Sequence, residues 1–181
     1  MAEVSVLDLF RPRLWLAAIT DVDPEQLRAR GIRGIVLDLD NTLVPYGSTA
    51  VPDEVRGWVQ GVRAAGFPLV LVTNNRTRRT RDLAESLALP IAPGWAKPTT
   101  SMFRRAMEMM GTIPAQTALV GDQLLTDILG GNRLGLFTIL VTRLEGREFP
   151  TTRLINRTIE RVLLRLLRLP EPARRAMPRA P

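Results

Sequence analysis

Short apolar runs that alternate with helical patterns constrain the fold of this chain more than any other feature. Residues 34–40 form one such run and end in carboxylates, as expected for a buried strand of a parallel sheet. A helical spacing of valines then predicts a helix over 52–65, which Gly66 would stop. The same order recurs, with further strands predicted over 67–73, 90–91, 117–121 and 137–142 and further helices over 77–87, 99–110 and 126–134. The pattern predicts an α/β fold, a three-layer α/β/α Rossmann-like parallel sheet.

Length and composition predict one globular domain. The chain has 181 residues, of which 45% are hydrophobic, enough for one core and too few for two large domains. We predict an N-terminal amphipathic lead over 1–31, the core over 32–150, a basic amphipathic helix over 151–169 and a disordered tail over 170–181. The tail is rich in Pro, Arg and Ala and has too few apolar residues to fold alone.

The chain contains neither cysteine nor histidine. Without cysteine it cannot form disulfides or thiolate metal sites, which argues against zinc. Without histidine, any acid–base catalysis must use carboxylates, lysine, tyrosine or water. No secretory-type apolar stretch lies near Met1, so we expect a cytoplasmic protein.

The formal net charge is +7 and is carried mostly by arginine. Such a charge favours a polyanionic partner, and nucleic acid, an acidic membrane surface and a phosphorylated substrate all fit. The basic residues gather in the N-terminal lead, in residues 76–81 and after Arg143. This distribution indicates that the core and its basic flanks have separate roles.

Polar side chains follow several of the predicted strands. Because ligands of parallel α/β sheets bind outside the carboxyl ends of the strands, we expect these side chains to form one site. The candidates are Asp38 and Asp40 after the first strand, Thr73 and Asn74 after the second, Lys97 before a helix, and Asp122 with Asp127 after a later strand.

The two carboxylates of the first strand suit covalent phosphoryl chemistry. A carboxylate at Asp38 can attack a phosphoryl group and form an acyl-phosphate, which divides one hard hydrolysis into two easier steps. A second carboxyl at Asp40 can protonate the leaving oxygen and then activate water, the work that histidine cannot do here.

The other candidates would hold a cation and the phosphoryl group. Oxygen ligands from Asp38, a backbone carbonyl near Asp40, and Asp122 suit Mg²⁺, which would let an anionic substrate approach these acids. Lys97 would neutralise charge on the phosphoryl oxygens, and Thr73 would hydrogen-bond them. Asp127 would orient Lys97 or support the metal.

Each of these segments also has an ordinary structural interpretation. Asp-x-Asp-Asn-Thr after a strand is often only a turn, a lone lysine such as Lys97 is more often solvated, and Thr73-Asn74-Asn75 can simply cap a helix. Asp127 can favour a helix start without further function. The joint order of all four segments favours the site.

Residues 38–43, 73–75, 97–98 and 121–127 resemble the four motifs of haloacid dehalogenase-type (HAD) phosphatases. They read Asp-Leu-Asp-Asn-Thr-Leu, Thr-Asn-Asn, Lys-Pro and Gly-Asp-Gln-Leu-Leu-Thr-Asp. The resemblance covers about 32–141. It implies Asp38 as nucleophile, Asp40 as acid/base, Lys97 for charge stabilisation, Thr73 and Asn74 with Lys97 for substrate binding, and a Mg²⁺ site at Asp38, Asp40, Asp122 and Asp127.

The chain has little room for the cap domain that many members of this superfamily insert between motifs. It therefore resembles the uncapped subclass III, whose substrates tend to be large or presented on a surface. Leu9-Phe10-Arg11-Pro12 and residues 31–43 resemble the bacterial YqeG-like branch, which is similar to mitochondrial phosphatidylglycerophosphate phosphatases. This resemblance implies a phospholipid phosphate as substrate.

The predicted C-terminal helix is basic and amphipathic. Its apolar stripe can pack on the core, or it can enter an anionic membrane surface while the arginines meet lipid headgroups. Residues 10–19, which include Trp15, can likewise pack on the core or contact a membrane surface. No segment is long and uncharged enough to span a bilayer. The stripe consists of Ile155, Ile159, Val162, Leu163, Leu166 and Leu167, opposite Arg153, Arg157, Arg161 and Arg165.

The main hypothesis is a Mg²⁺-dependent phosphomonoester hydrolase acting through an aspartyl-phosphate, with phosphatidylglycerophosphate as the implied substrate and a peripheral position on the inner membrane face. A second hypothesis keeps the site but replaces the lipid with soluble sugar or nucleotide phosphates or nucleic-acid ends. A third is a non-catalytic membrane or nucleic-acid adaptor, which the intact motifs disfavour.

Overall fold

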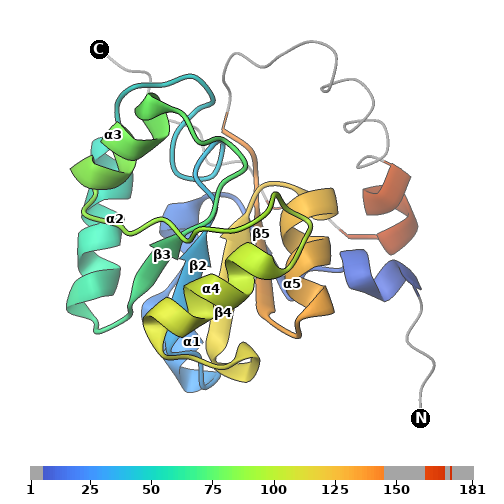
Figure 1. Ribbon diagram of the computed structural model, residues 1–181. Coiled ribbons are helices and arrows are strands. Elements are labelled where there is room, and N and C mark those ends of the chain that lie inside the picture. The colour runs from blue at the N-terminus through green and yellow to red at the C-terminus, as the bar shows by residue number, and fades with distance from the viewer. Residues whose placement is uncertain (1–5, 145–161, 170–171, 173–181) are drawn as a thin grey trace.

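A parallel sheet forms the middle layer of the molecule (Figure 1). The computed structural model describes residues 6–144, 162–169 and 172. Within these residues the sheet has five strands in the order β1-β5-β4-β2-β3, all parallel, as predicted. The strands are β1 (Leu14–Leu16), β2 (Gly34–Leu37), β3 (Leu69–Leu71), β4 (Thr117–Gly121) and β5 (Phe137–Val141).

Helices cover both faces of this sheet because successive residues of its strands point in opposite directions. Ile35 and Leu37 of β2 join a core with α1 (Pro24–Ala29), α2 (Asp53–Ala64) and α3 (Arg78–Ser86). Val36, between them, joins a second core with α4 (Ser101–Met110), which Figure 1 shows in front of the strands. The predicted three-layer α/β/α arrangement is confirmed.

Local sequence signals explain where the helices begin and end. The Thr77 hydroxyl accepts a hydrogen bond from the Thr80 backbone N–H and caps α3. Gly111 adopts the left-handed conformation, with φ of 65°, and ends α4. The predicted helices over 52–65, 77–87 and 99–110 therefore lie within two residues of the observed ones.

Four elements differ from the prediction, and one of them is the helix α1, which was not predicted. β1 was not predicted, because three residues carry too little periodicity, and it pairs with β5 at the edge of the sheet. The strand predicted over 90–91 is only an isolated bridge between Leu71 and Ile91. The helix predicted over 126–134 begins earlier, as a π-helical segment η4 (Leu124–Ile128) that continues into α5 (Leu129–Arg133). Short 3-10 turns complete the list: η1 (Val6–Phe10), η2 (Ile19–Asp21) and η3 (Pro114–Gln116).

The C-terminal helix is described only in its last part. Residues 162–167 are helical, whereas 151–161 and nearly all of the predicted tail lie outside the described residues. Leu163 and Leu164 pack against Leu124, Ile128 and Leu140, and Leu167 is buried. Val162 and Leu166 are exposed, so in these residues the predicted apolar stripe faces partly the body and partly solvent.

The connections that could carry a cap domain contain none. Residues 38–52 join β2 to α2, and residues 87–100 join α3 to α4, without a helix in either. The part of the chain described here also has no helix long and apolar enough to cross a membrane.

Candidate active site

The predicted site residues meet at the carboxyl edge, the edge of the sheet formed by the carboxyl ends of its strands. Asp38 follows β2 and Asp122 follows β4, and these two strands are hydrogen-bonded neighbours. The chain runs from β2 to β3 on one side and then crosses to β4 on the other. Ligand sites of open α/β sheets form at such a switch in strand order.

A buried lysine joins two of the carboxylates. The Lys97 ammonium lies 2.5 Å from Asp38 Oδ1 and 2.6 Å from Asp127 Oδ1. Asp38, Lys97 and Asp127 are only 4%, 6% and 0% exposed, so water screens these charges little. The lysine therefore compensates for two acids that would otherwise repel each other and any phosphate.

Burial perturbs the ionisation of this group. It raises the pKa of the Asp38 carboxyl to about 6, against the opposing charge of Lys97. Burial and the negative charge of Asp38 raise the pKa of Asp122 to about 8, although Arg143 opposes the rise. Burial lowers the pKa of Lys97, but Asp127 and Asp38 outweigh it, so that pKa lies above its usual value. The raised pKa values of Asp38 and Asp122 show that Lys97 and Arg143 do not fully balance the negative charge of the buried carboxylates.

The carboxylates of Asp38, Asp122 and Asp127 fit a metal ion. One oxygen from each lies within 4.8 Å of the others. Asp122 Oδ2 accepts a hydrogen bond from Arg143 Nε at 2.6 Å, whereas the buried Oδ1 has no partner among the described residues. A buried polar atom without a partner is costly, and a hard divalent cation among three carboxylates would satisfy it.

Gly121 permits this close grouping. A Cβ atom at this position would lie 2.4 Å from Cγ of Asp127, inside any allowed contact. Only glycine therefore lets the Asp127 carboxyl group lie against the end of β4, beside Asp122.

Asp40 stands apart from the three grouped carboxylates. Its side chain forms an ion pair with Arg79 and accepts a hydrogen bond from Asn75 Nδ2 at 3.2 Å. Its carboxylate does not belong to the metal-fitting group, so a metal role for Asp40 would fall to its backbone carbonyl. Asp40 nevertheless lines the same hollow as Asp38 and Lys97, and the residue after it, Asn41, adopts a left-handed φ of 63°.

Thr73 and Asn74 lie in the site, but Asn74 has a structural task as well. Asn74 Oδ1 accepts a hydrogen bond from the Lys97 backbone N–H at 2.7 Å, and its amide donates to the Lys97 carbonyl at 3.3 Å. The Thr73 hydroxyl accepts from the Asn75 N–H at 3.0 Å. Both residues line a hollow of about 360 Å³ together with Asp38, Asp40, Lys97, Tyr46, Gln123 and Thr126.

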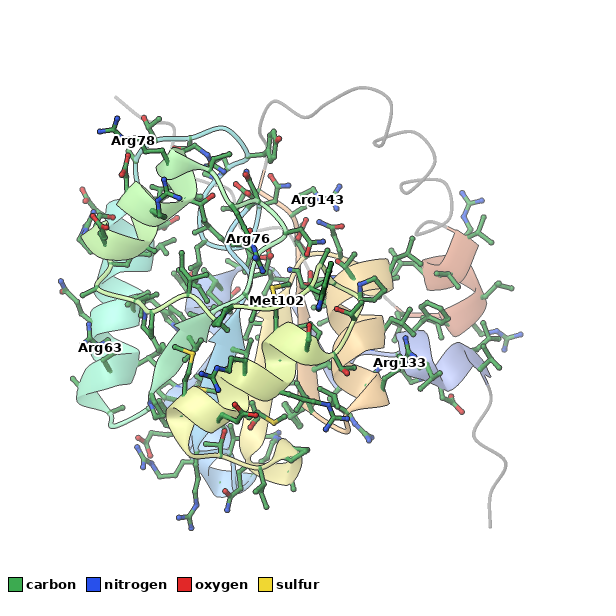
Figure 2. All side chains as sticks on the ribbon, in the orientation of Figure 1. Arg63, Arg76, Arg78, Met102, Arg133 and Arg143 are labelled. Atoms are coloured by element: carbon green, nitrogen blue, oxygen red, sulfur yellow. The ribbon has the colours of Figure 1, made fainter. Side chains whose placement is uncertain are left out.

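Several residues that contact the predicted side chains were not themselves predicted as site residues. Arg79 pairs with Asp40, Arg143 bonds Asp122, and the Thr42 hydroxyl donates to Asp38 Oδ2 at 3.2 Å. Arg143 did carry a signal, because it follows β5 at the same edge of the sheet (Figure 2). Arg79 lies within α3, and nothing in its sequence context distinguishes it from the arginines around it.

The chain is similar to known phosphatases. It is 36% identical over 159 residues to "Probable phosphatase YqeG" of Bacillus subtilis (strain 168), a match that covers 88% of this chain and 92% of that protein. It is 28% identical over 166 residues to phosphatidylglycerophosphate phosphatase 1, chloroplastic/mitochondrial, of Arabidopsis thaliana. That match covers 87% of this chain but 47% of the plant protein.

A protein-family model also matches part of the chain, and the fold is similar to that of a solved structure. The model described as "HAD-hyrolase-like" matches residues 94–154. The fold resembles that of 3-deoxy-D-manno-octulosonate 8-phosphate phosphatase from Yersinia pestis, with a TM-score of 0.51 and 20% identity over 78% of this chain and 85% of that one. The chain therefore belongs to the HAD-type phosphatases, hydrolases of phosphate monoesters, and within them to the YqeG-like branch.

Proposed function

We propose that this chain is a Mg²⁺-dependent phosphomonoesterase that forms an aspartyl-phosphate on Asp38. The observation that carries the proposal is the position of Asp38, which contacts the buried Lys97 ammonium and belongs to the carboxylate group that fits a cation. A carboxylate can attack an anionic phosphoryl group only where positive charge surrounds both.

The reaction would proceed in two transfers. A carboxylate oxygen of Asp38 attacks phosphorus, the bond from phosphorus to the leaving oxygen breaks, and Asp40 supplies the proton to that oxygen. Asp40 then takes a proton from water, whose oxygen attacks phosphorus and breaks its bond to Asp38. Inorganic phosphate leaves and Asp38 is restored. Arg79 and Asn75 hold the Asp40 carboxyl group during both transfers.

Asp38, Asp122 and Asp127, with the backbone carbonyl of Asp40, would hold Mg²⁺. The ion would supply positive charge for the phosphoryl oxygens. Lys97 offers a second positive charge to the phosphoryl group, and the Thr73 hydroxyl a hydrogen bond. Arg143 keeps one oxygen of Asp122 engaged and leaves the other for the metal.

Hydrolysis of p-nitrophenyl phosphate tests this mechanism. We expect activity with Mg²⁺, none with EDTA, and a loss of at least about a thousandfold in Asp38→Asn. Mass spectrometry of protein quenched during turnover should find phosphate on the peptide that contains Asp38. Asp53→Asn, an exposed acid in the first turn of α2, is the matched control and should keep full activity. Full Mg²⁺-dependent activity in Asp38→Asn would refute the assignment.

We further propose that the substrate is a phospholipid phosphate, with phosphatidylglycerophosphate as the first candidate, hydrolysed at a membrane surface. The name of the plant relative supports this substrate class. The absence of a cap over the described carboxyl edge and the net charge of +7 support it independently, because both favour an anionic substrate presented on a surface.

Substrate competition tests the lipid assignment. Phosphate release from phosphatidylglycerophosphate in mixed micelles is compared with release from glycerol 3-phosphate, sugar phosphates and nucleotides, with Asp38→Asn as the blank. We expect the lipid to have the highest kcat/KM. A higher kcat/KM for a soluble compound would retain the phosphatase mechanism and reject the lipid substrate.

A further inference from the structure

Trp95 is 80% exposed, the most exposed of the large hydrophobic side chains in the described residues. Its backbone is nevertheless fixed. The Trp95 N–H donates to Ser101 Oγ at 2.8 Å, and its carbonyl accepts from Thr99 Oγ1 at 3.0 Å. The indole is thus held out into solvent by an ordered turn, which exposes apolar surface at a free-energy cost.

This tryptophan lies beside the active site. It precedes the buried Lys97 by two residues, and the Arg76 guanidinium donates to the carbonyl of the adjacent Gly94. Arg76 itself comes from the loop that follows β3 and carries Thr73 and Asn74. Trp95 therefore lies in the loop that brings Lys97 to the carboxyl edge, and its side chain is exposed to solvent there.

The rim around Trp95 is basic. Residues 74–97 contain five lysines and arginines and two acids, Glu85 and Asp82, the latter 3.9 Å from the Arg78 guanidinium. Two of these basic residues, Arg79 and Lys97, turn inward to the site carboxylates. Arg76 and Arg78 are exposed, and Figure 2 shows both, like Arg143, in the upper half of the molecule.

We propose that the carboxyl edge docks on an anionic lipid bilayer, with the Trp95 indole in the interface and Arg76 and Arg78 against lipid phosphates. Tryptophan favours the bilayer interface because one side of its ring system is apolar and its N–H is polar, and arginine is attracted to anionic headgroups. The proposal rests on the proposed function for its substrate, a lipid phosphate that enters the site from the same surface.

The number of exposed aromatic side chains favours a bilayer over nucleic acid. Single-stranded nucleic acid is bound by successive aromatic side chains that stack with successive bases. Among the large hydrophobic residues exposed in the described part of the chain, Trp95 is the one aromatic side chain. A single indole surrounded by basic residues is sufficient for a lipid bilayer, because one side chain can insert into the bilayer interface without neighbouring aromatic residues.

Vesicle binding tests the docking surface without using catalysis. Wild-type protein is mixed with phosphatidylglycerol vesicles and with phosphatidylcholine vesicles, while tryptophan emission, quenching by brominated lipid and co-sedimentation are followed. We expect binding to phosphatidylglycerol only, with a blue shift and quenching that disappear in Trp95→Phe. Trp95→Ala and Arg78→Ala should each weaken binding about tenfold.

Matched controls come from the amino edge, at the opposite ends of the strands. Ile113 is 57% exposed shortly before β4, and Arg33 is exposed just before β2. Ile113→Ala and Arg33→Ala should therefore bind vesicles as the wild type does. Trp95→Ala should keep its activity on p-nitrophenyl phosphate but lose about tenfold in kcat/KM on lipid in vesicles.

The outcomes separate the two proposals. Vesicle binding that is equal in Trp95→Ala and wild type overturns the docking surface, whatever the substrate proves to be. Tighter binding to single-stranded DNA than to phosphatidylglycerol, lost in Trp95→Ala, would also overturn it in favour of nucleic acid. Trp95-dependent vesicle binding without lipid hydrolysis would keep the docking surface and reject the lipid substrate.

Discussion

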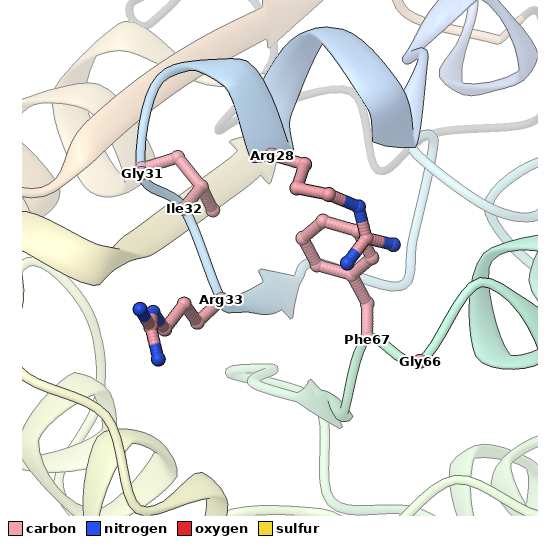
Figure 3. Close-up of a pocket in the computed structure, with 6 residues that line it drawn as sticks. All are labelled: Arg28, Gly31, Ile32, Arg33, Gly66 and Phe67. Atoms are coloured by element: carbon pink, nitrogen blue, oxygen red, sulfur yellow. The ribbon is translucent and has the colours of Figure 1, made fainter.

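Two hollows of similar size lie in different parts of this molecule, and only one contains a chemical site. The active-site hollow measures about 360 Å³ and the other about 340 Å³. The second lies where the turns after α1 and α2 meet, lined by Arg28, Gly31, Ile32, Arg33, Gly66 and Phe67 (Figure 3).

The two hollows differ in how their charges are paired. In the second hollow Arg28 lies over the Phe67 ring at 5.0 Å and bonds the carboxylate of Glu25 and the carbonyl of Ala65, so its guanidinium is satisfied within the protein. At the carboxyl edge, buried acids outnumber the lysine between them, and Asp122 Oδ1 has no hydrogen-bond partner within the described part of the chain. Unbalanced buried charge, and not hollow size, distinguishes a site that needs a ligand.

Among the changes that test this comparison of the two hollows, removal of the buried lysine should have the largest effect. In EDTA, Lys97→Met should lower the free energy of unfolding by about 3–5 kcal/mol, because Asp38 and Asp127 lose their shared cation. With Mg²⁺, activity should fall about 10²–10³-fold. Urea unfolding and steady-state kinetics measure the two effects.

Arg28→Met in the second hollow is the matched change. It removes a long cation from a partly exposed position and should leave kcat unchanged. If the two variants lost equal stability and equal activity, the distinction between the two hollows would be wrong.

A smaller effect is expected where an arginine positions a metal ligand. Arg143→Ala frees Asp122 Oδ2 and should weaken Mg²⁺ binding about 10–100-fold by titration calorimetry, as the loss of outer contacts to metal ligands generally does. Arg143→Lys should recover part of the affinity. Asp122→Asn provides the reference for loss of the ligand itself, and an unchanged Kd in Arg143→Ala would exclude a positioning role.

The smallest effect is expected at the second hollow itself. Arg28→Ala removes one cation–π contact, worth about 0.5–1 kcal/mol, together with an exposed ion pair to Glu25 and a hydrogen bond to the Ala65 carbonyl. For a protein of this size the midpoint of thermal unfolding should fall by about 2–4 °C, with unchanged hydrolysis of p-nitrophenyl phosphate. Loss of activity in Arg28→Ala would show that a change in the second hollow alters the active site.

Most of the candidate site could be predicted from sequence because its residues follow strands. Asp38 comes directly after β2 and Asp122 directly after β4, so a strand prediction also locates the acids. The partners of these acids could not be predicted in the same way. Arg79 is 39 residues from Asp40 and Arg143 is 21 from Asp122, and a long flexible side chain can reach many positions.

The same division holds for the fold. The central strands and the main helices could be predicted from local patterns, because apolar runs and helical spacing record which faces become buried. Long-range contacts in the folded molecule add Leu14–Leu16 as an edge strand beside β5 and bring Leu163 and Leu164 close to it. Long-range contacts also bring Asp38 and Asp127 to the same cation, the Lys97 ammonium group. These features depend on contacts between segments that lie far apart in the chain. The free energies of such contacts cannot be estimated from a local sequence pattern.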